Sequence, residues 1–287
     1  HTDIPAGIIN IVPSSDPQKI GVQLVNDPRV DMISFTGSTS TGRAIMSDAA
    51  ATVKKVFLEL GGKSANIILD DADFSQALLS ALAVCFHAGQ GCAIQTRLLI
   101  PRKRQNEVEK ILMNYFKMID YGGDNTDTHI MGPLISSVQR KKVLDYIEKG
   151  KAEGARLLLG GGTPSHLDKG FYVEPTVFVD VTNDMTIAQE EIFGPVLCLI
   201  KYESEDEAIQ IANDTPYGLA GYVQGEHGHA LEVASKIRAG QITINKGARV
   251  RSAPFGGYKT SGNGREHGSH GLEECLETKA VIGALVE

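Results

Sequence analysis

The chain has 287 residues, which suits two domains of ordinary size better than one. Hydrophobic residues make up 42% of the chain and charged residues 22%, which is typical of globular proteins rather than of disordered or fibrous ones. Asp and Glu (35) outnumber Lys and Arg (28), giving a net charge of -7. This charge argues against a nucleic-acid partner, which requires a basic face.

The sequence predicts neither a membrane segment nor a metal site. The longest apolar run, residues 77–86, is too short to span a bilayer, and the opening HTDIPAG lacks the features of a signal peptide. The cysteines at positions 85, 92, 198 and 275 have no CxxC spacing, and the histidines offer no zinc pattern. We therefore expect a reducing compartment, the cytoplasm.

Short β-rich runs alternate with amphipathic runs along the chain. Asp73 is expected to cap a buried helix, Ser136 and Gln139 have capping-box spacing, and Gly240 is expected to close a helix. This alternation predicts an α/β fold with a largely parallel sheet. Strands are expected at 30–35, 53–60, 64–69, 97–101, 155–162, 172–181, 195–202, 241–245 and 278–286; helices at 43–51, 74–89, 104–119, 137–153, 205–214 and 229–240; and an ordered loop at 254–271.

A small-residue turn, GSTSTG at 37–42, follows a predicted strand and opens a predicted helix. Backbone N–H groups in that position can hold a phosphate, although an ordinary strand-to-helix turn would have the same sequence. The turn is not a P-loop, because Arg43 and Ala44 follow Gly42 where Lys and Ser or Thr are required. It also lacks GxGxxG spacing, so the standard dinucleotide fingerprint is missing.

Among the cysteines, Cys92 is the best candidate for chemistry. It follows the predicted buried helix in GQGCA (89–93), where small neighbours leave room for a substrate. Cys85 and Cys198 lie in apolar elements and are expected to be inert core residues, and the acidic neighbours of Cys275 disfavour its thiolate. A nucleophilic thiol needs a lowered pKa or a nearby base, and the residues next to Cys92 in the sequence do not show which of the two it has.

Two acidic positions are also notable. Glu59 ends an otherwise apolar run just before two glycines, where a charge is costly unless it has a partner or a function. Glu190 and Glu191 precede IFGP, and a solvated turn is the simpler explanation for this pair.

Taken together and in this order, these segments resemble one family, the NAD(P)-dependent aldehyde dehydrogenases. The resemblance begins at residues 4–7 and continues to the end of the chain. The matching stretches are FTGSTSTGR (35–43), LELGGKSANIILDDAD (58–73), GQGC (89–92), EEIFGPV (190–196), NDTPYGLAGYV (213–223) and PFGGYKTSGNGRE (254–266).

The resemblance implies oxidation of an aldehyde to a carboxylic acid through a thiohemiacetal and a thioester on a cysteine. Cys92 matches the family's nucleophile. Glu59 matches the general base that activates water for thioester hydrolysis, and Glu266 matches a second acid in a proton path behind that base.

The cofactor implied by the resemblance is NAD or NADP, and the sequence leaves the choice between them open. Gly37, Ser38 and Gly42 match the turn near the pyrophosphate. The remaining matched positions fall into two sets: Leu60, Glu191 and Phe193 at the nicotinamide and its ribose, and Phe255, Gly91 and Ala93 at the substrate tunnel.

The fold implied is an aldehyde-dehydrogenase-like α/β fold. Residues 1–61 would form part of a Rossmann-type cofactor domain, 62–262 the catalytic domain, and 263–287 a return segment with an oligomerisation strand. The expected assembly is a homo-oligomer, a dimer or a tetramer. The family's N-terminal half, with its asparagine oxyanion donor and its adenosine-contacting lysine, has no match. We therefore expect a fragment, a truncated gene product or one of two chains, nearly inactive alone.

Two other functions stay open at this point. One is a non-catalytic structural or binding protein that keeps the fold, and the other is an enzyme that passes the acyl group to coenzyme A, although Glu59 favours hydrolysis. Arg249 and Arg251 lie where the family anchors the far end of its substrate. They are either anchors for the carboxylate of a semialdehyde substrate or solvated loop residues.

Overall fold

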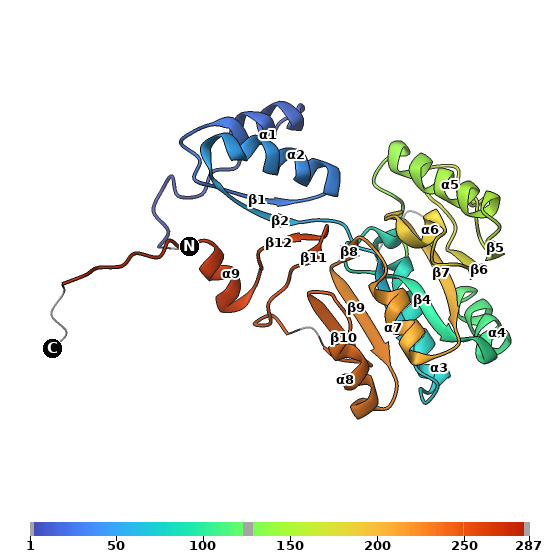
Figure 1. Ribbon diagram of the computed structural model, residues 1–287. Helices are drawn as coiled ribbons and strands as arrows, with labels where there is room; N and C mark the ends of the chain where they lie inside the picture. Colours follow the sequence, from blue (N-terminus) through green and yellow to red (C-terminus); the bar gives the residue numbers. More distant parts are fainter. Residues whose placement is uncertain (1–2, 123–128, 249, 284–287) are drawn as a thin grey trace.

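The computed structural model describes residues 3–122, 129–248 and 250–283, and its strands form a larger and a smaller sheet joined through a short two-stranded ribbon (Figure 1). The strands are β1 (Met32–Thr36), β2 (Lys55–Glu59), β3 (Ser64–Ile68), β4 (Gln95–Pro101), β5 (Arg156–Leu159), β6 (Thr176–Val181), β7 (Val196–Tyr202), β8 (Tyr217–Gly218), β9 (Ala220–Gln224), β10 (Gln241–Ile244), β11 (Tyr258–Lys259) and β12 (Gly262–Asn263).

Helices flank both sheets. A long 3₁₀ helix, η2 (Leu78–Gly89), continues directly from α3, and shorter 3₁₀ turns cover Ala50–Thr52 and Arg102–Arg104. The α-helices are α1 (Pro17–Asn26), α2 (Thr39–Ala49), α3 (Phe74–Ala77), α4 (Gln105–Phe116), α5 (Ser137–Ala152), α6 (Thr186–Gln189), α7 (Glu205–Asn213), α8 (His227–Ser235) and α9 (Gly268–Glu274). None of the helices in the described ranges is both long enough and apolar enough to cross a membrane.

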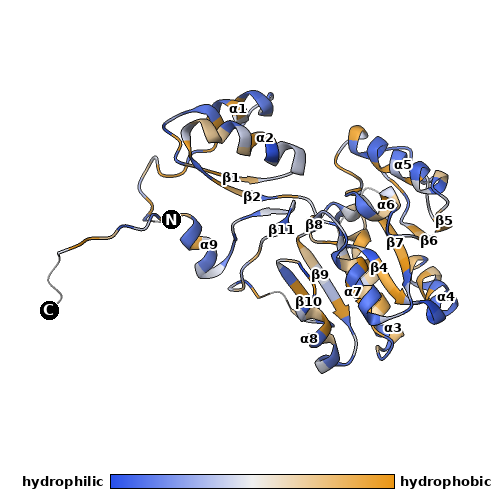
Figure 2. Ribbon diagram, in the orientation of Figure 1, coloured by the Kyte–Doolittle hydropathy of each residue, from blue (hydrophilic) through white to orange (hydrophobic). Residues whose placement is uncertain are grey.

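The predicted α/β fold with a largely parallel sheet is confirmed. The larger sheet has the order β10-β9-β3-β4-β7-β6-β5, and its pairings are parallel except for β5 with β6. All five residues of β3 are buried, and six of the seven in β7, as expected where helices cover both faces of a parallel sheet. Figure 2 shows the apolar residues concentrated on the central strands and the polar ones on the surrounding helices.

The smaller sheet has the order β1-β2-β12, and it joins the beginning of the chain to its last third. β1 pairs with β2 in parallel, and β12 pairs with β2 antiparallel, with Gly262 opposite Glu59. The backbone of β2 is therefore held along both edges. This fixes the position of its last residue, Glu59, relative to two distant parts of the sequence.

The predicted buried helix at 74–89 is only partly correct. Its start is confirmed, because Asp73 Oδ1 accepts the N–H groups of Ser75 and Gln76. Its remainder is 3₁₀ rather than α, and it breaks at an extended Phe86 followed by left-handed His87 (φ 51°) and Ala88 (φ 52°). The apolar sequence did not reveal this break, since the break serves a tertiary contact: Gly89 lies directly against the carbonyl of Gly194.

Other predicted boundaries also need correction. α8 ends at Ser235 and is capped by Lys236, so Gly240 closes no helix; a Cβ on Gly240 would instead overlap the carbonyl of Gly256. The expected loop at 254–271 contains β11, β12 and the start of α9, and β9 and α1 were not expected. Of the strand expected at 278–286, residues 278–283 are not in a strand, because they pair with no strand in the described part of the chain. Residues 284–286 lie outside the described residues.

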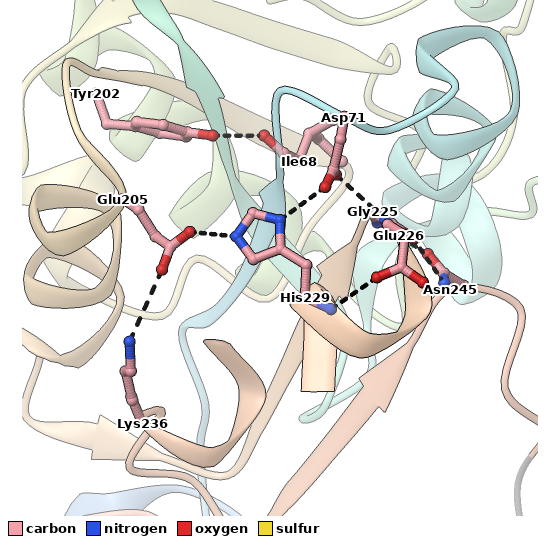
Figure 3. A network of polar contacts seen from close by, with 9 residues as sticks. All are labelled: Ile68, Asp71, Tyr202, Glu205, Gly225, Glu226, His229, Lys236 and Asn245. Carbon is pink, nitrogen blue, oxygen red and sulfur yellow. Dashed lines mark hydrogen bonds and ion pairs between the residues drawn. The ribbon is translucent and has the colours of Figure 1, made fainter. Parts of the chain in front are cut away.

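A polar network ties three elements together at one end of the larger sheet (Figure 3). His229 of α8 contacts Asp71 through Nδ1 at 2.7 Å and Glu205, the first residue of α7, through Nε2 at 2.5 Å. Since a carboxylate only accepts hydrogen bonds, a doubly protonated imidazolium satisfies both contacts. The hydrogen bond to Asp71, and then that to Glu205, raise the pKa of His229.

Candidate active site

A cavity of about 540 Å³ lies between the two sheets. Glu59 and Thr36 reach it from the ends of β2 and β1, and Cys92 reaches it from the loop after η2. Glu266 and Phe255 enter from the segments on either side of β11 and β12. The cavity therefore collects side chains from the beginning, the middle and the end of the sequence.

Glu59 is a deeply buried carboxylate. It is 2% exposed, and neither of its carboxylate oxygens has a hydrogen-bond partner among the described residues. Burial first, and then the charge of Glu266, raise the pKa of Glu59 to about 7, against the opposing charge of Arg265. A carboxyl group with this pKa exchanges protons readily near neutral pH, as a general base must.

The Cys92 loop is placed by close backbone packing. A Cβ on Gly62 would overlap the carbonyl oxygen of Cys92, so a side chain at position 62 would displace the loop. Cys92 itself is half-buried. Burial, and then the charges of Glu59 and Glu191, raise the pKa of its thiol, while backbone N–H groups of Ala93 and Cys92 oppose the rise. In this arrangement the thiol is protonated at neutral pH and needs a base to react.

Glu191 lies against the glycines that follow Glu59. Its Oε1 accepts the N–H of Gly62 at 2.9 Å, and a Cβ on Gly61 would overlap its Oε2. Burial raises the pKa of Glu191, while the Gly62 N–H and then the nearby Lys142 and Lys63 lower it. Glu191 is thus a partly buried acceptor held at the start of the larger sheet, not the side chain of a solvated turn.

Gln139 supports the turn that carries Phe193. Phe193 has a left-handed backbone (φ 58°), and the Gln139 amide donates to the carbonyls of Ile192 at 3.2 Å and Phe193 at 2.8 Å. The N–H of Gln139 donates to Ser136 Oγ, as the predicted capping box requires. The Gln139 side chain goes to the Phe193 turn, so only half of that box forms.

The turn at 37–42 opens α2, as expected. Ser38 is the N-cap and accepts the N–H of Thr41 at 3.2 Å, and both Gly37 and Ser38 are exposed at the end of β1. Gly42 is buried instead, where a Cβ would lie 2.6 Å from Leu60 Cδ2. Gly42 therefore lets α2 pack against the residue that follows Glu59.

The family model described as "Aldehyde dehydrogenase family" matches residues 1–281. The chain belongs to the aldehyde dehydrogenase family. It is 49% identical over 284 residues to a 3-succinoylsemialdehyde-pyridine dehydrogenase of a Pseudomonas species, covering 98% of this chain and 59% of that protein. It therefore spans about three fifths of the length of the curated relatives that it matches.

Solved aldehyde dehydrogenases share the fold. Aldehyde dehydrogenase C of Pseudomonas syringae, crystallised with NAD+ and octanal, superposes with a TM-score of 0.91 at 47% identity, over 93% of this chain and 56% of that one. An aldehyde dehydrogenase of Mycobacterium tuberculosis with NAD+ gives a TM-score of 0.88 at 46% identity, over 91% and 55%. The aldehyde-dehydrogenase-like fold expected from the sequence is confirmed.

Within this aldehyde dehydrogenase chain, the sequence-selected residues fall into groups. Gly37 and Ser38 are at the start of α2. Leu60 precedes the Gly61-Gly62 turn and Glu191 accepts the N–H of Gly62, while Phe193 lies in the turn held by Gln139. Arg251 is exposed, and Arg249 lies outside the described residues. Of the residues selected from the sequence, those that line the cavity are Cys92, Glu59, Glu266, Phe255, Gly91 and Ala93.

Several cavity residues were not identified from the sequence. Phe86 and His87 enter because η2 breaks there, and Ile94 enters from the same loop as Cys92. Tyr222 and Thr243 come from β9 and β10, which end at the same side of the sheet. The signal for Tyr222 and Thr243 is topological, because neighbouring parallel strands present residues along a common edge; the sequence of β9 does not predict a strand.

Proposed function

We propose that this chain carries the catalytic part of an enzyme that oxidises an aldehyde to a carboxylic acid with NAD or NADP. The observation that supports this most is the placement of the Cys92 thiol and the Glu59 carboxylate in one cavity, where Glu59 has no hydrogen-bond partner among the described residues. A purely structural role gives no reason to bury such a carboxylate.

The proposed reaction uses each group twice. Glu59 accepts the thiol proton, and Cys92 Sγ forms a bond to the carbonyl carbon while the carbonyl electrons move onto oxygen. As the oxyanion electrons re-form the C=O bond, hydride leaves that carbon for an oxidant, which NAD or NADP would supply, and a thioester remains on Cys92; Glu59 releases the thiol proton to solvent and is ionised again. Glu59 then accepts a proton from water as the water oxygen attacks the thioester, and the C–S bond breaks to release the acid and the thiol.

The residues present fit a dinucleotide. The exposed N-terminus of α2 at Ser38 suits a pyrophosphate, and Glu191 is a partly buried acceptor beside Gly62 that suits ribose hydroxyls. When bound, the nicotinamide supplies the hydride acceptor. The Cys92 backbone N–H is the proposed oxyanion donor within this chain, and the second donor is proposed to come from the part of the relatives' length that this chain does not span.

The substrate is proposed to be an aldehyde with an apolar body. Phe86, Ile94 and Phe255 give the cavity apolar walls. This agrees with octanal in the Pseudomonas syringae complex, while the 3-succinoylsemialdehyde-pyridine dehydrogenase acts on a semialdehyde by its name. Arg251 remains the proposed carboxylate anchor if this chain takes a semialdehyde.

For the whole protein, we propose a cytoplasmic homo-oligomer in which the remaining length of the relatives is supplied on the same or on a second chain. A free Cys92 favours a reducing compartment. Ile282 is 96% exposed, which suits a segment that is covered by a neighbouring subunit. In the proposed division, residues 1–61 bind the cofactor, residues 62–262 carry out the chemistry and residues 263–287 mediate assembly. Light scattering at micromolar concentration tests the oligomer.

The reaction is tested by following NADH formation with a panel of aldehydes, with and without coenzyme A, and NAD binding by isothermal titration. We expect weak NAD binding and very slow turnover from the 287-residue chain alone, and coenzyme A-independent turnover when the remaining length is supplied. Turnover that requires coenzyme A would identify the acylating enzyme. A complete protein without turnover on any aldehyde would identify a non-catalytic relative.

A further inference from the structure

Arg265 holds together the segment that forms the wall beside Glu59. It follows β12 and precedes Glu266. Its Nη1 donates to the carbonyl of Gly257 at 3.2 Å and to that of Gly264 at 2.6 Å. Its guanidinium carbon lies 5.4 Å from the centre of the Tyr258 ring. One side chain therefore connects residues 256–258 to residues 264–265.

Gly256 separates this side chain from the carboxylate. A Cβ on Gly256 would lie 2.8 Å from Glu59 Oε1 and 3.0 Å from Arg265 Cδ. Glu59 and the stem of Arg265 thus pack against the same glycine, and a shift of residues 256–258 would change the space around the carboxylate.

Two neighbouring charges of opposite sign act on Glu59. Glu266, beside Arg265 in sequence, disfavours ionised Glu59, while Arg265 favours it. The other titratable groups that line the cavity are Cys92, His87 and Tyr222. Among the described residues whose charge acts on Glu59, Arg265 is the cation. An opposite charge near a buried carboxylate stabilises the ionised form, which is the form that accepts a proton.

We propose that Arg265 is a positioning residue for Glu59: it fixes residues 256–258 against the carboxylate and supplies the positive charge that opposes Glu266. The inference rests on the proposed function, in which ionised Glu59 accepts protons from the thiol and from water. Arg265 touches neither the substrate nor the reacting atoms in this role. It sets the fraction of Glu59 that is ready to act.

The test is a direct titration of Glu59 in the 287-residue chain. The protein is labelled with ¹³C at the glutamate carboxyl carbons, and the Glu59 resonance is assigned by its disappearance in Glu59→Gln. We expect a titration midpoint near neutral pH in the parent chain, raised by about one pH unit in Arg265→Gln and lowered in Glu266→Gln. Arg102→Gln, which removes a surface arginine paired with Glu203, should leave it unchanged.

Arg265→Lys separates charge from geometry, and it also serves if Arg265→Gln does not fold. Lysine keeps the charge but lacks the planar group that bonds two carbonyls. We expect a midpoint shift less than half of that in Arg265→Gln, with faster amide hydrogen exchange in residues 256–258. The proposal would be overturned if the Glu59 midpoint in Arg265→Gln were unchanged or lowered. It would also be overturned if Arg265→Lys had both the midpoint and the amide exchange of the parent chain. The titration needs no turnover, so it fails or succeeds independently of the aldehyde assay.

Discussion

The charged groups in the cavity around Glu59 and in the network around His229 differ in whether they have hydrogen-bond partners. His229 has a carboxylate at each ring nitrogen, and its contacts join α7, α8 and the loop after β3. Glu59 is more deeply buried, yet its oxygens have no hydrogen-bond partner in the described part of the chain. The first arrangement uses charge to hold elements together. The second leaves a proton acceptor unsatisfied, at a cost in stability, which is the arrangement that a general base requires.

The largest effect is expected when the unsatisfied carboxylate is removed from the assembled enzyme. Glu59→Gln keeps the shape but cannot accept a proton, so steady turnover should fall by about 10²–10⁴-fold, the usual contribution of a general base. If its main role is in deacylation, a burst of about one NADH per site should survive. Rapid-mixing absorbance at the NADH band measures both phases. Unchanged turnover would remove Glu59 from the mechanism.

The same substitution should stabilise the folded chain at alkaline pH. The pKa of Glu59 is raised to about 7 in the folded state, so its ionisation costs stability as pH rises above the unfolded value of ~4.3, and the full cost is present above pH ~7. We expect Glu59→Gln to increase the free energy of unfolding at pH 8 by on the order of 2–3 kcal/mol, with little gain at pH 4. Urea denaturation at the two pH values measures this. A gain of equal size at both would contradict the assignment.

Removal of the Glu59 charge should also make Cys92 easier to alkylate. Burial is the first cause of the raised pKa of Cys92, and Glu59 is the second. In a Cys275→Ser background, which removes the exposed cysteine, Glu59→Gln should increase the rate of iodoacetamide labelling at Cys92 by several-fold, about 1 kcal/mol. Peptide mass spectrometry locates the label. Cys85, whose pKa is raised to about 12 by burial, is the internal control. Iodoacetamide reports the thiolate present at equilibrium in the resting chain, whereas Glu59 is proposed to take the thiol proton during attack on the aldehyde, so slower labelling would contradict the effect of the Glu59 charge on the pKa of the thiol.

The smallest effect is expected in the satisfied network. The raised pKa of His229 means that its stabilisation is fully present below the ordinary pKa of ~6.5 and is lost as pH rises through the folded value. Burial alone would raise the pKa of Asp71, but the hydrogen bonds from His229 and the Glu226 N–H lower it, so its contribution fades as pH falls through that lowered value. Because the site is partly exposed, His229→Gln should cost at most about 1 kcal/mol near pH 6 and less at pH 9. Thermal melts at both pH values test the sign; a larger loss at pH 9 would contradict it.

The sequence predicted the architecture where local pattern decides it. Strands such as β3 and β7 are continuous apolar runs, and the caps at Asp73 and Ser136 lie where their side chains indicated. β9 was missed because glycine and alanine within it are poor strand signals. The break in η2 was missed because it depends on the contact between Gly89 and Gly194, 105 residues later in the chain.

The sequence predicted which residues belong to the site but not which groups surround them. The small neighbours of Cys92 and the isolated charge of Glu59 identified both residues as candidates, and the family motifs related them to each other. The placement of Glu266 and Arg265 beside Glu59 depends on β12 pairing with β2, which no local pattern near either segment encodes. The partnerless state of Glu59 also depends on the packed structure, because it is a property of its surroundings.

That pairing has a consequence for the order of folding. The Ser261 hydroxyl donates to the carbonyl of Gly61 at 2.6 Å, across 200 residues of sequence. Closing so long a loop carries a large entropic cost, and contacts of this separation slow folding. The larger sheet, whose strands lie between these two positions, is able to form before the loop closes. We expect the Glu59 pocket to form in the last kinetic phase of refolding, so that a newly synthesised chain would have most of its core before it has a working base.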